Sequence, residues 1–427
     1  MKGGGSALQP LRRRDFAVIW LAALVSNVGT WMQTVAVGVL IAEVTGQAGW
    51  TGLVAAAAFL PVGLLSPVGG AMADRVDRRR WLLLTTVGET VFAAALAVLV
   101  GTGRVNAGAI TLLVLAGGAM AALGYPAYQA LLPDLVPREE LLAATSLTLA
   151  QYNLGRVVGP ALAGVVLAVG SYTWAFAINA VSFAAVILAI LAVRLPPNRA
   201  TTEEGGLWAR IVAGARGAAA EPGCRLAIVS IGVTAFLLSP FIALIPAVAL
   251  KLFGDADTGT SVLITAQGVG AVIGALLLAW AATRWGRRRV LVADMVLLPA
   301  LLVGYAAAPT LAVGTVMLLL VGGAYVGLLS GFGAVVQLRA PDALRARILS
   351  LYGVALGVVY PIGSVVQGFL GDRLGLRVVT AGTALLYLAV VGLLAVTRPG
   401  LAAAYDEPPD ADEADVVVPP TAAAPAP

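Results

Sequence analysis

Histidine is absent from the 427-residue chain, and cysteine occurs once, at Cys224. These absences exclude an internal disulfide, a cysteine-based metal cluster, histidine zinc sites and catalysis by a histidine base. Charge is scarce as well, because only 11% of the residues are Asp, Glu, Lys or Arg, where a soluble protein has about 25%. Hydrophobic residues make up 60% and the mean hydropathy is +0.94. The composition therefore predicts a membrane protein.

Long apolar runs give the number of membrane spans. A helix that crosses a hydrocarbon core of about 30 Å needs about 20 mainly apolar residues. Twelve such runs lie between charged or Gly/Pro-rich breaks, near 16–41, 50–73, 81–102, 107–131, 141–169, 172–193, 226–250, 259–282, 290–308, 310–336, 346–371 and 376–397. The weakest break is at Pro309, which alone separates two runs. We predict an all-α membrane protein with twelve transmembrane helices.

The distribution of Lys and Arg predicts the orientation of these helices. Positive residues gather in the cytoplasmic loops of membrane proteins. With twelve spans and an inside N-terminus, 22 of the 27 Lys and Arg residues fall inside, four fall outside, and Arg156 lies within a span. A missed span would scramble this division. We therefore predict a multi-pass protein of the cell membrane with both termini in the cytoplasm.

The chain divides into two halves that repeat each other. A polar linker at 194–225 separates a six-helix bundle at 16–193 from another at 226–397, with a cytoplasmic N-terminus at 1–15. Pro137 and Pro341, Ser146 and Ser350, and Gly164 and Gly368 share one offset of 204 residues. Such internal repeats are typical of transporter folds, so we expect two bundles related by a pseudo-two-fold axis.

Two segments outside the spans have compositions of their own. The tail at 398–427 is acidic and ends in Pro/Ala-rich sequence, so we expect it to be disordered. The middle of the linker, at 207–211, has the pattern of an amphipathic helix on the membrane surface.

A loop motif follows the second predicted span and reads Gly70-x-x-x-Asp74-Arg75-x-Asp77-Arg78-Arg79. It resembles the loop 2–3 signature of the major facilitator superfamily, with Asp77 where glycine is commoner, and the resemblance covers the chain apart from the tail. It implies a cytoplasmic lock formed by Gly70, Asp74, Arg75 and Arg78. The alternative is that the arginines only anchor the topology. In the second half Thr283 stands at the aspartate position, which weakens any second lock.

A second motif lies in the fifth span, with Gly155, Gly159, Pro160 and Gly164. It is similar to the glycine-proline signature of antiporters in this superfamily, which implies export. Residues 132–160 and 345–352 resemble more narrowly the enterobactin-exporter and macrolide-efflux branch, whose substrates are amphipathic compounds. Ordinary helix packing through small residues is the alternative interpretation of these glycines.

Charged residues are rare inside the predicted spans. A lone guanidinium near the bilayer interior is costly and normally faces a cavity or a partner. We therefore expect Arg156 to pair with Glu89 in the third span or with a carboxylate of the substrate. Glu89 is also our candidate proton carrier. Asp294 lies close to the start of the ninth span and is therefore expected at the membrane interface. A structural ion pair, or a snorkelling arginine, is the alternative.

Polar and aromatic residues mark a candidate substrate cavity. Most of them sit on the first, fourth, seventh and tenth spans, which would line the centre by analogy with the superfamily, and Asn153 sits on the fifth. The set is Asn27, Trp31, Thr34, Tyr125, Gln129, Asn153, Phe236, Phe241 and Tyr325. Interhelical hydrogen bonding is the alternative for each of them taken singly.

Three functions fit these patterns: a proton-coupled exporter of amphipathic small molecules, an importer or symporter of a small metabolite, and a receptor or enzyme without transport. The lack of histidine and of a paired nucleophile and base disfavours an enzyme, and the fifth-span motif disfavours import. We expect a monomeric antiporter of drug, macrolide or siderophore type that works by alternating access, without cofactor, metal or nucleic acid. The sequence does not identify the substrate.

Overall fold

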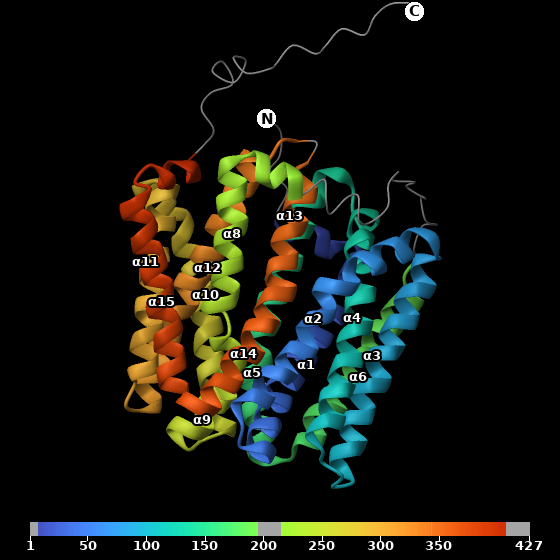
Figure 1. Cartoon of the computed structure of the whole chain (residues 1–427). Helices are drawn as coiled ribbons and strands as arrows, with labels where there is room; N and C mark the ends of the chain where they lie inside the picture. Colours follow the sequence, from blue (N-terminus) through green and yellow to red (C-terminus); the bar gives the residue numbers. More distant parts are fainter. Residues whose placement is uncertain (1–6, 195–214, 343, 407–427) are drawn as a thin grey trace, which may run out of the picture.

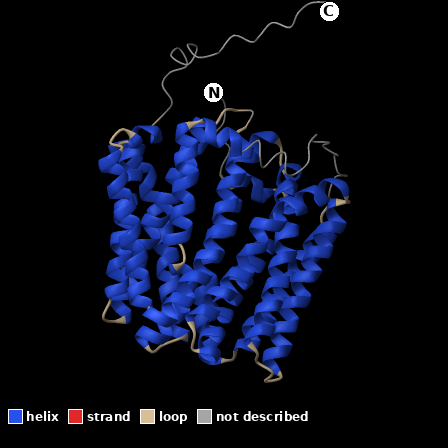
Figure 2. Ribbon diagram, in the orientation of Figure 1, coloured by secondary structure: helices blue, strands red, loops and turns tan. Residues whose placement is uncertain are grey.

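The computed structural model describes residues 7–194, 215–342 and 344–406 (Figure 1). Within them the chain is helical without a strand (Figure 2). The predicted surface helix at 207–211 and the tail from residue 407 lie outside the described residues. Twelve helical segments in the described part of the chain are long and apolar enough to span a membrane, so the predicted number is confirmed.

The first half consists of six long helices, α1 (Arg14–Thr45), α2 (Ala48–Arg75), α3 (Arg78–Gly101), α4 (Ala107–Leu135), α5 (Leu141–Val169) and α6 (Tyr172–Ala192). The second half consists of α8 (Pro222–Leu237), α9 (Phe241–Phe253), α10 (Asp257–Trp285), α11 (Arg287–Ala307), α12 (Leu311–Arg339), α13 (Arg345–Val354), α14 (Tyr360–Leu374) and α15 (Leu376–Thr397). The weak break at Pro309 is real, because Thr310 accepts a hydrogen bond from Val313 N and so begins α12.

The two halves stand side by side and touch along α2 with α14 and along α5 with α10 (Figure 1). Corresponding helices pack alike in both halves. A Cβ added at Gly118 of α4 would lie 2.8 Å from the Ala58 carbonyl oxygen of α2, and one at Gly274 of α10 would lie 2.7 Å from the Gly323 carbonyl oxygen of α12. The glycines thus let both helix pairs approach closely, as a duplicated bundle requires.

Both ends of the described chain lie on one face, which we call the terminal face; the opposite one is the far face (Figure 1). The 3-10 helix Gln9–Arg12 and the 3-10 helix Leu401–Tyr405 both belong to the terminal face. The turns between α1 and α2 and between α11 and α12 belong to the far face, because each helix reverses the direction of the one before it.

Two spans are interrupted rather than continuous. The seventh, predicted as one run, is split into α8 and α9 by a turn at 238–240. The carbonyl oxygens of Phe236 and Leu237 accept hydrogen bonds from Gln367 Nε2 of α14, at 2.7 and 3.1 Å. Backbone groups freed inside a membrane must find such partners. The eleventh span carries a π-helix, Ala355–Val359, between α13 and α14, a feature that often occurs at functional sites.

The start of the acidic tail departs from the expected disorder. Leu401–Tyr405 form a 3-10 helix, and the buried Tyr405 hydroxyl lies 2.8 Å from Ser230 Oγ. Asp406 forms an ion pair with Arg288, and its carbonyl oxygen accepts from Arg339 at 3.0 Å. Residues 401–406 therefore pack on the second half. The buried side chain of Tyr405 anchors them there, although the acidic composition of the tail as a whole suggested disorder.

A second contact on the terminal face yields a pH-dependent prediction. Glu221 accepts a hydrogen bond from Cys224 N at the start of α8 and pairs with Arg339 at 2.6 Å. Burial raises the pKa of Glu221, but the hydrogen bonds from Arg339 and the backbone outweigh it and lower the pKa overall. A lowered folded-state pKa adds stability above the unfolded pKa, and that stability is lost as the pH falls through the folded pKa.

We therefore expect Glu221→Gln to destabilise the purified protein by about 1–2 kcal/mol at pH 7, seen as a lower thermal unfolding temperature. The difference from wild type should shrink as the pH falls through the lowered folded-state pKa of Glu221, because the protonated glutamate carries no charge, like glutamine. Asp342→Asn is the control, since Asp342 pairs with Arg345 with 89% of its side chain exposed, and it should change little at either pH. A deficit of Glu221→Gln that persists unchanged in acid would contradict this interpretation.

Candidate functional site

Arg156 of α5 lies where the two halves meet. Its Nη2 atom donates a hydrogen bond to Gln267 Oε1 of α10, in the other half, at 2.9 Å. The guanidinium carbon lies 5.8 Å from the ring centroid of Trp31, within the range of a cation–π contact. Trp31 also meets Tyr152 edge to face, with ring centroids 5.9 Å apart. Arg156, Gln267, Trp31 and Tyr152 form what we call the central cluster.

Gln267 is one of the two members of this cluster, with Tyr152, that sequence reasoning missed. It is 2% exposed, and its Nε2 atom has no hydrogen-bond partner. The same helix carries further buried hydroxyls without partners, on Thr260, Ser261 and Thr265. A row of polar residues in an otherwise apolar helix was the available signal, but the sequence does not show which of them would meet Arg156.

The glycines of the fifth-span motif set the position of α5. A Cβ at Gly159 would lie 2.5 Å from the Cβ of Trp31, and one at Gly155 would lie 3.1 Å from the Cβ of Asn27, so both glycines admit α1. A Cβ at Gly164 would lie 2.9 Å from the Cβ of Ser261 on α10. Pro160 is buried within α5. The motif therefore holds α5 against both α1 and α10.

Glu89 does not pair with Arg156. It lies on α3, which packs against α4 and α6, whereas α5 packs mainly against α1 and α10. Within the described residues Glu89 forms neither an ion pair nor a hydrogen bond, and its side chain is half-buried. The predicted Arg156–Glu89 pair is wrong, because α3 and α5 pack against different helices.

The predicted cavity residues separate into two groups. Thr34, Tyr125, Gln129 and Asn153 are exposed, and Asn27 and Trp31 are half-buried. Tyr125 accepts a hydrogen bond from Gln129 Nε2 at 2.7 Å, one turn along α4. Asn153 and Thr34 bond to the backbone of their own helices.

The residues from the second half lie mostly in its core. Phe241 and Tyr325 are 3% and 6% exposed and meet edge to face at 5.7 Å. Tyr325 donates to Ser239 Oγ at 3.1 Å. Phe236 is half-buried at the end of α8, beside the break. The alternative of interhelical hydrogen bonding therefore describes Tyr325 in this conformation, whereas Phe241 is held by packing against it.

The loop motif lies on the terminal face, where its residues have different surroundings. Asp77 begins α3 by accepting a hydrogen bond from Arg80 N at 2.9 Å, which explains an aspartate at that position. Arg78 is tied to α4 of its own half through the Ala130 carbonyl oxygen, at 3.1 Å, and Asp134. Asp74 and Arg75 are exposed. A Cβ at Gly70 would lie 3.8 Å from Pro126, an ordinary contact.

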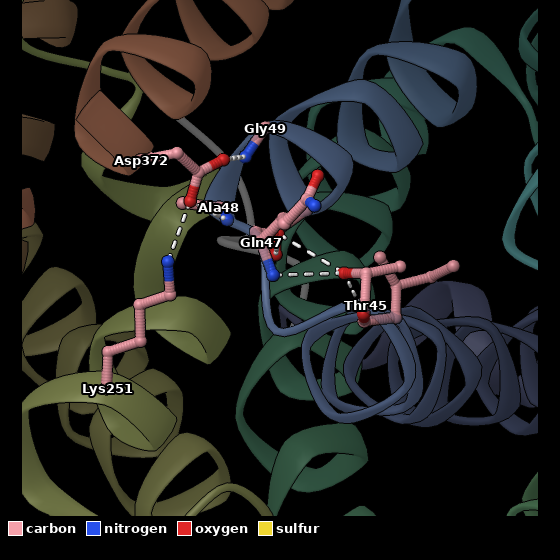
Figure 3. Close-up of polar contacts among 8 residues, drawn as sticks. Thr45, Gln47, Ala48, Gly49, Lys251 and Asp372 are labelled. Atoms are coloured by element: carbon pink, nitrogen blue, oxygen red, sulfur yellow. Dashed lines mark hydrogen bonds and ion pairs between the residues drawn. The ribbon is translucent and has the colours of Figure 1, made fainter.

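The far face carries a contact between the halves that the sequence did not predict (Figure 3). Asp372 of α14 accepts hydrogen bonds from Ala48 N and Gly49 N, both at 2.8 Å, at the first residues of α2. The Nζ atom of Lys251 donates to the same carboxylate at 2.7 Å. We call Asp372, Ala48, Gly49 and Lys251 the far-face latch.

The latch gives α2 a cap that its own sequence lacks. Gln47, the residue before α2, makes no side-chain capping bond. The first N–H groups of a helix have no partner inside it, and the positive end of the helix dipole favours an anion there. The carboxylate of Asp372 therefore caps α2 from the other half of the molecule.

A second polar bridge lies on the far face. The hydroxyl of Tyr172, at the start of α6, is 2.6 Å from Glu43 Oε2 of α1 and 2.9 Å from Asp257 Oδ1 of α10. It thus links two helices of the first half to one of the second. Between pairs of described residues, the hydrogen bonds that join the halves lie on the far face and at the central cluster. Among the described residues, the polar contacts that hold the halves together are thus concentrated on the far face and in the centre.

Residues 5–416 match the model of the transmembrane secretion effector family of the major facilitator superfamily. The chain belongs to this family. The multidrug efflux pump Tap of Mycolicibacterium fortuitum is 29% identical over 402 residues, which cover 91% of this chain and 97% of the pump. The pump of the same name from Mycobacterium tuberculosis is 30% identical over 405 residues, covering 90% and 93%. The enterobactin exporter EntS of Citrobacter koseri is 35% identical over 187 residues, 43% of this chain and 44% of the exporter.

Solved structures share the fold of this family member. The nucleoside transporter NupG has a TM-score of 0.71 at 12% identity, over 90% of this chain and 98% of that one. A bacterial homologue of the human lysosomal transporter Spinster, in an inward-facing and unoccupied conformation, has a TM-score of 0.67 at 13% identity, over 92% and 97%. At these identities the likeness shows the fold alone, which is the predicted pair of six-helix bundles.

Proposed function

We propose that the protein exports amphipathic small molecules across the cell membrane by alternating access. The observation that carries the direction of transport is the end-to-end similarity to efflux pumps, with about nine tenths of this chain and of the pumps aligned. The antiporter-like glycines of α5 support alternating access, because Gly155 and Gly159 hold α5 against α1 while Gly164 holds it against α10 of the other half.

We place the terminal face in the cytoplasm, since the loops on that side carry most of the Lys and Arg residues. The far face is then the outside. The far-face latch and the Tyr172 bridge close the outside, and the exposed Asp74 and Arg75 belong to a cytoplasmic lock that is not engaged. In the opposite state, Asp74 and Arg75 would close the cytoplasmic side while the latch opens.

Export is tested in a drug-hypersensitive bacterium and in inside-out vesicles made from it. Cells that express the protein should accumulate several-fold less of at least one macrolide, siderophore or cationic dye, and an uncoupler should abolish the difference. Vesicles should take the same compound up. Increased accumulation in the cells would favour import and contradict the proposal.

We also propose that Glu89 carries the coupled proton. A carboxyl without an ion pair inside a span can exchange a proton as its surroundings change, and such residues usually serve function. Glu89→Gln keeps the shape of the side chain and removes the titrating group. We expect substrate-driven proton flux in proteoliposomes to fall at least tenfold, with the folded yield unchanged.

Asp294→Asn is the matched control, because Asp294 also lies within a span but packs beside Gly327 of α12. It should retain proton flux. Wild-type flux in Glu89→Gln would remove Glu89 from the mechanism, and loss of flux in Asp294→Asn alone would transfer the role to Asp294.

A further inference from the structure

The central cluster has more hydrogen-bond donors than acceptors. A guanidinium has five N–H donors, and Arg156 uses one of them, toward Gln267 Oε1. Gln267 Nε2, on the same amide group, is buried without a partner. Two groups from opposite halves thus present unused donors at one place.

The charge of Arg156 is not balanced by the protein. Within the described residues Arg156 forms no ion pair, and its one side-chain hydrogen bond is to a neutral amide. A cation between membrane helices is costly unless it meets an anion or water. A negatively charged group would satisfy both the charge and the unused donors.

The surroundings of Arg156 also indicate what such an anion is attached to. Trp31 lies beside the guanidinium, and Tyr152, which is 45% exposed, meets Trp31 edge to face. Aromatic faces favour contact with flat apolar groups. The cluster therefore combines a cation with a fork of donors and an adjoining aromatic surface.

We propose that Arg156 and Gln267 bind the carboxylate of the transported compound, and that the substrates of this site are amphipathic anions with an aromatic or apolar body. A planar carboxylate matches the two-pronged geometry of a guanidinium. Because Arg156 and Gln267 come from different halves, a bound carboxylate is held at the junction across which the halves move. This inference rests on the proposed export function and specifies its substrate.

A purely structural tie between the halves is the rival explanation, and Gln267→Glu separates the two. Glutamate has the shape of glutamine but would form an ion pair with Arg156, so it occupies the guanidinium that the substrate needs. A structural tie would be strengthened by this pair. If the cluster is a substrate site, Gln267→Glu would prevent the binding of an anionic substrate and leave the aromatic surface intact.

The experiment uses three probes with the same body: pyrenebutyrate, pyrenebutanol and pyrenebutylamine. Their uptake is measured in inside-out vesicles that contain the full-length wild type or a variant, and their binding is measured on the purified protein. Wild type should bind and transport the carboxylate best. Gln267→Glu should lower transport of the carboxylate at least tenfold. It should leave transport of the alcohol unchanged or raise transport of the amine. Arg156→Lys, which keeps the charge without the fork, should show a smaller loss than Arg156→Gln.

Gln33→Glu is the matched control. Gln33 accepts a hydrogen bond from Asn179 Nδ2 at 2.9 Å, and a glutamate there can accept the same bond. It should leave the preference among the three probes unchanged. Equal loss of all probes in Gln267→Glu, or no loss, overturns the carboxylate site. A wild-type preference for the amine would contradict the carboxylate site and leave the proposed export function standing. If wild type transports none of the probes or screened drugs, the proposed export function is itself contradicted.

Discussion

Asp372→Ala is expected to open the far face and to abolish most transport. The change removes two charge-assisted hydrogen bonds to the N-terminus of α2, and with them the cap of that helix. At about 1.5 kcal/mol for each bond, the closed state loses about 3 kcal/mol, a shift of about a hundredfold in the ratio of closed to open molecules. Transport needs both states, so turnover should fall at least tenfold.

The shift can be measured by cysteine accessibility. Ser364 of α14 is fully buried under the latch, and Cys224, the one native cysteine, is replaced by alanine. A cysteine at position 364 should react slowly with a membrane-impermeant maleimide applied from the far face, and much faster when Asp372→Ala is added.

Lys251→Gln provides the control for the latch, because it removes an ion pair that is partly exposed and leaves the cap of α2 in place. Such pairs contribute about 0.2–1 kcal/mol, so the labelling rate should change by no more than about fivefold. If Asp372→Ala and Lys251→Gln change the rate equally, the cap does not hold the far face closed.

Gly52→Ala is expected to have a comparable effect through packing. Gly52 of α2 faces the backbone of α14, and a Cβ there would overlap the Ser364 carbonyl oxygen and lie 2.8 Å from its carbon. Backbone atoms cannot move aside as a flexible side chain can, so the two helices must separate. Overpacking of this kind costs about 1–3 kcal/mol, and the cost falls on the closed state. We expect transport to decrease about tenfold or more.

Gly382→Ala on α15 is the matched control, because a Cβ there meets nothing within 4 Å. It should leave transport unchanged and stabilise its helix slightly. Both variants are compared for folded yield by gel filtration and for transport in vesicles. Normal transport by Gly52→Ala would show that the close contact of α2 with α14 is not part of the working cycle.

The helices could be predicted from the sequence because hydropathy, loop charge and the weak break at Pro309 are local signals. The contacts between the two halves could not be predicted in this way. Asp372 caps α2 from more than 300 residues away, as the bond to Ala48 shows, and nothing in its own neighbourhood marks it as a cap. Lys251 stands out in the sequence only as one of the four positive residues that fall in the predicted outside loops.

The same limit applies to the central cluster. Arg156 was identified because a charge inside a span is costly wherever it points, which is a local argument. Its partner was not, because pairing depends on which helices are neighbours, and the structure joins α5 to α10 rather than to α3. Aromatic residues in spans were ambiguous for a related reason, since Tyr325 fills the core and Tyr125 is exposed.

Distances between the halves at the two faces test alternating access most directly. Spin labels at Arg104 and Pro309 report on the far face, and labels at Arg138 and Arg347 report on the terminal face; all four positions are exposed. Double electron–electron resonance on the protein in lipid nanodiscs should find a population with the far-face pair close and the terminal-face pair apart. Transported compound or a change of pH should lengthen the first distance and shorten the second together. Two distances that stay fixed, or that change in the same direction, would contradict the account.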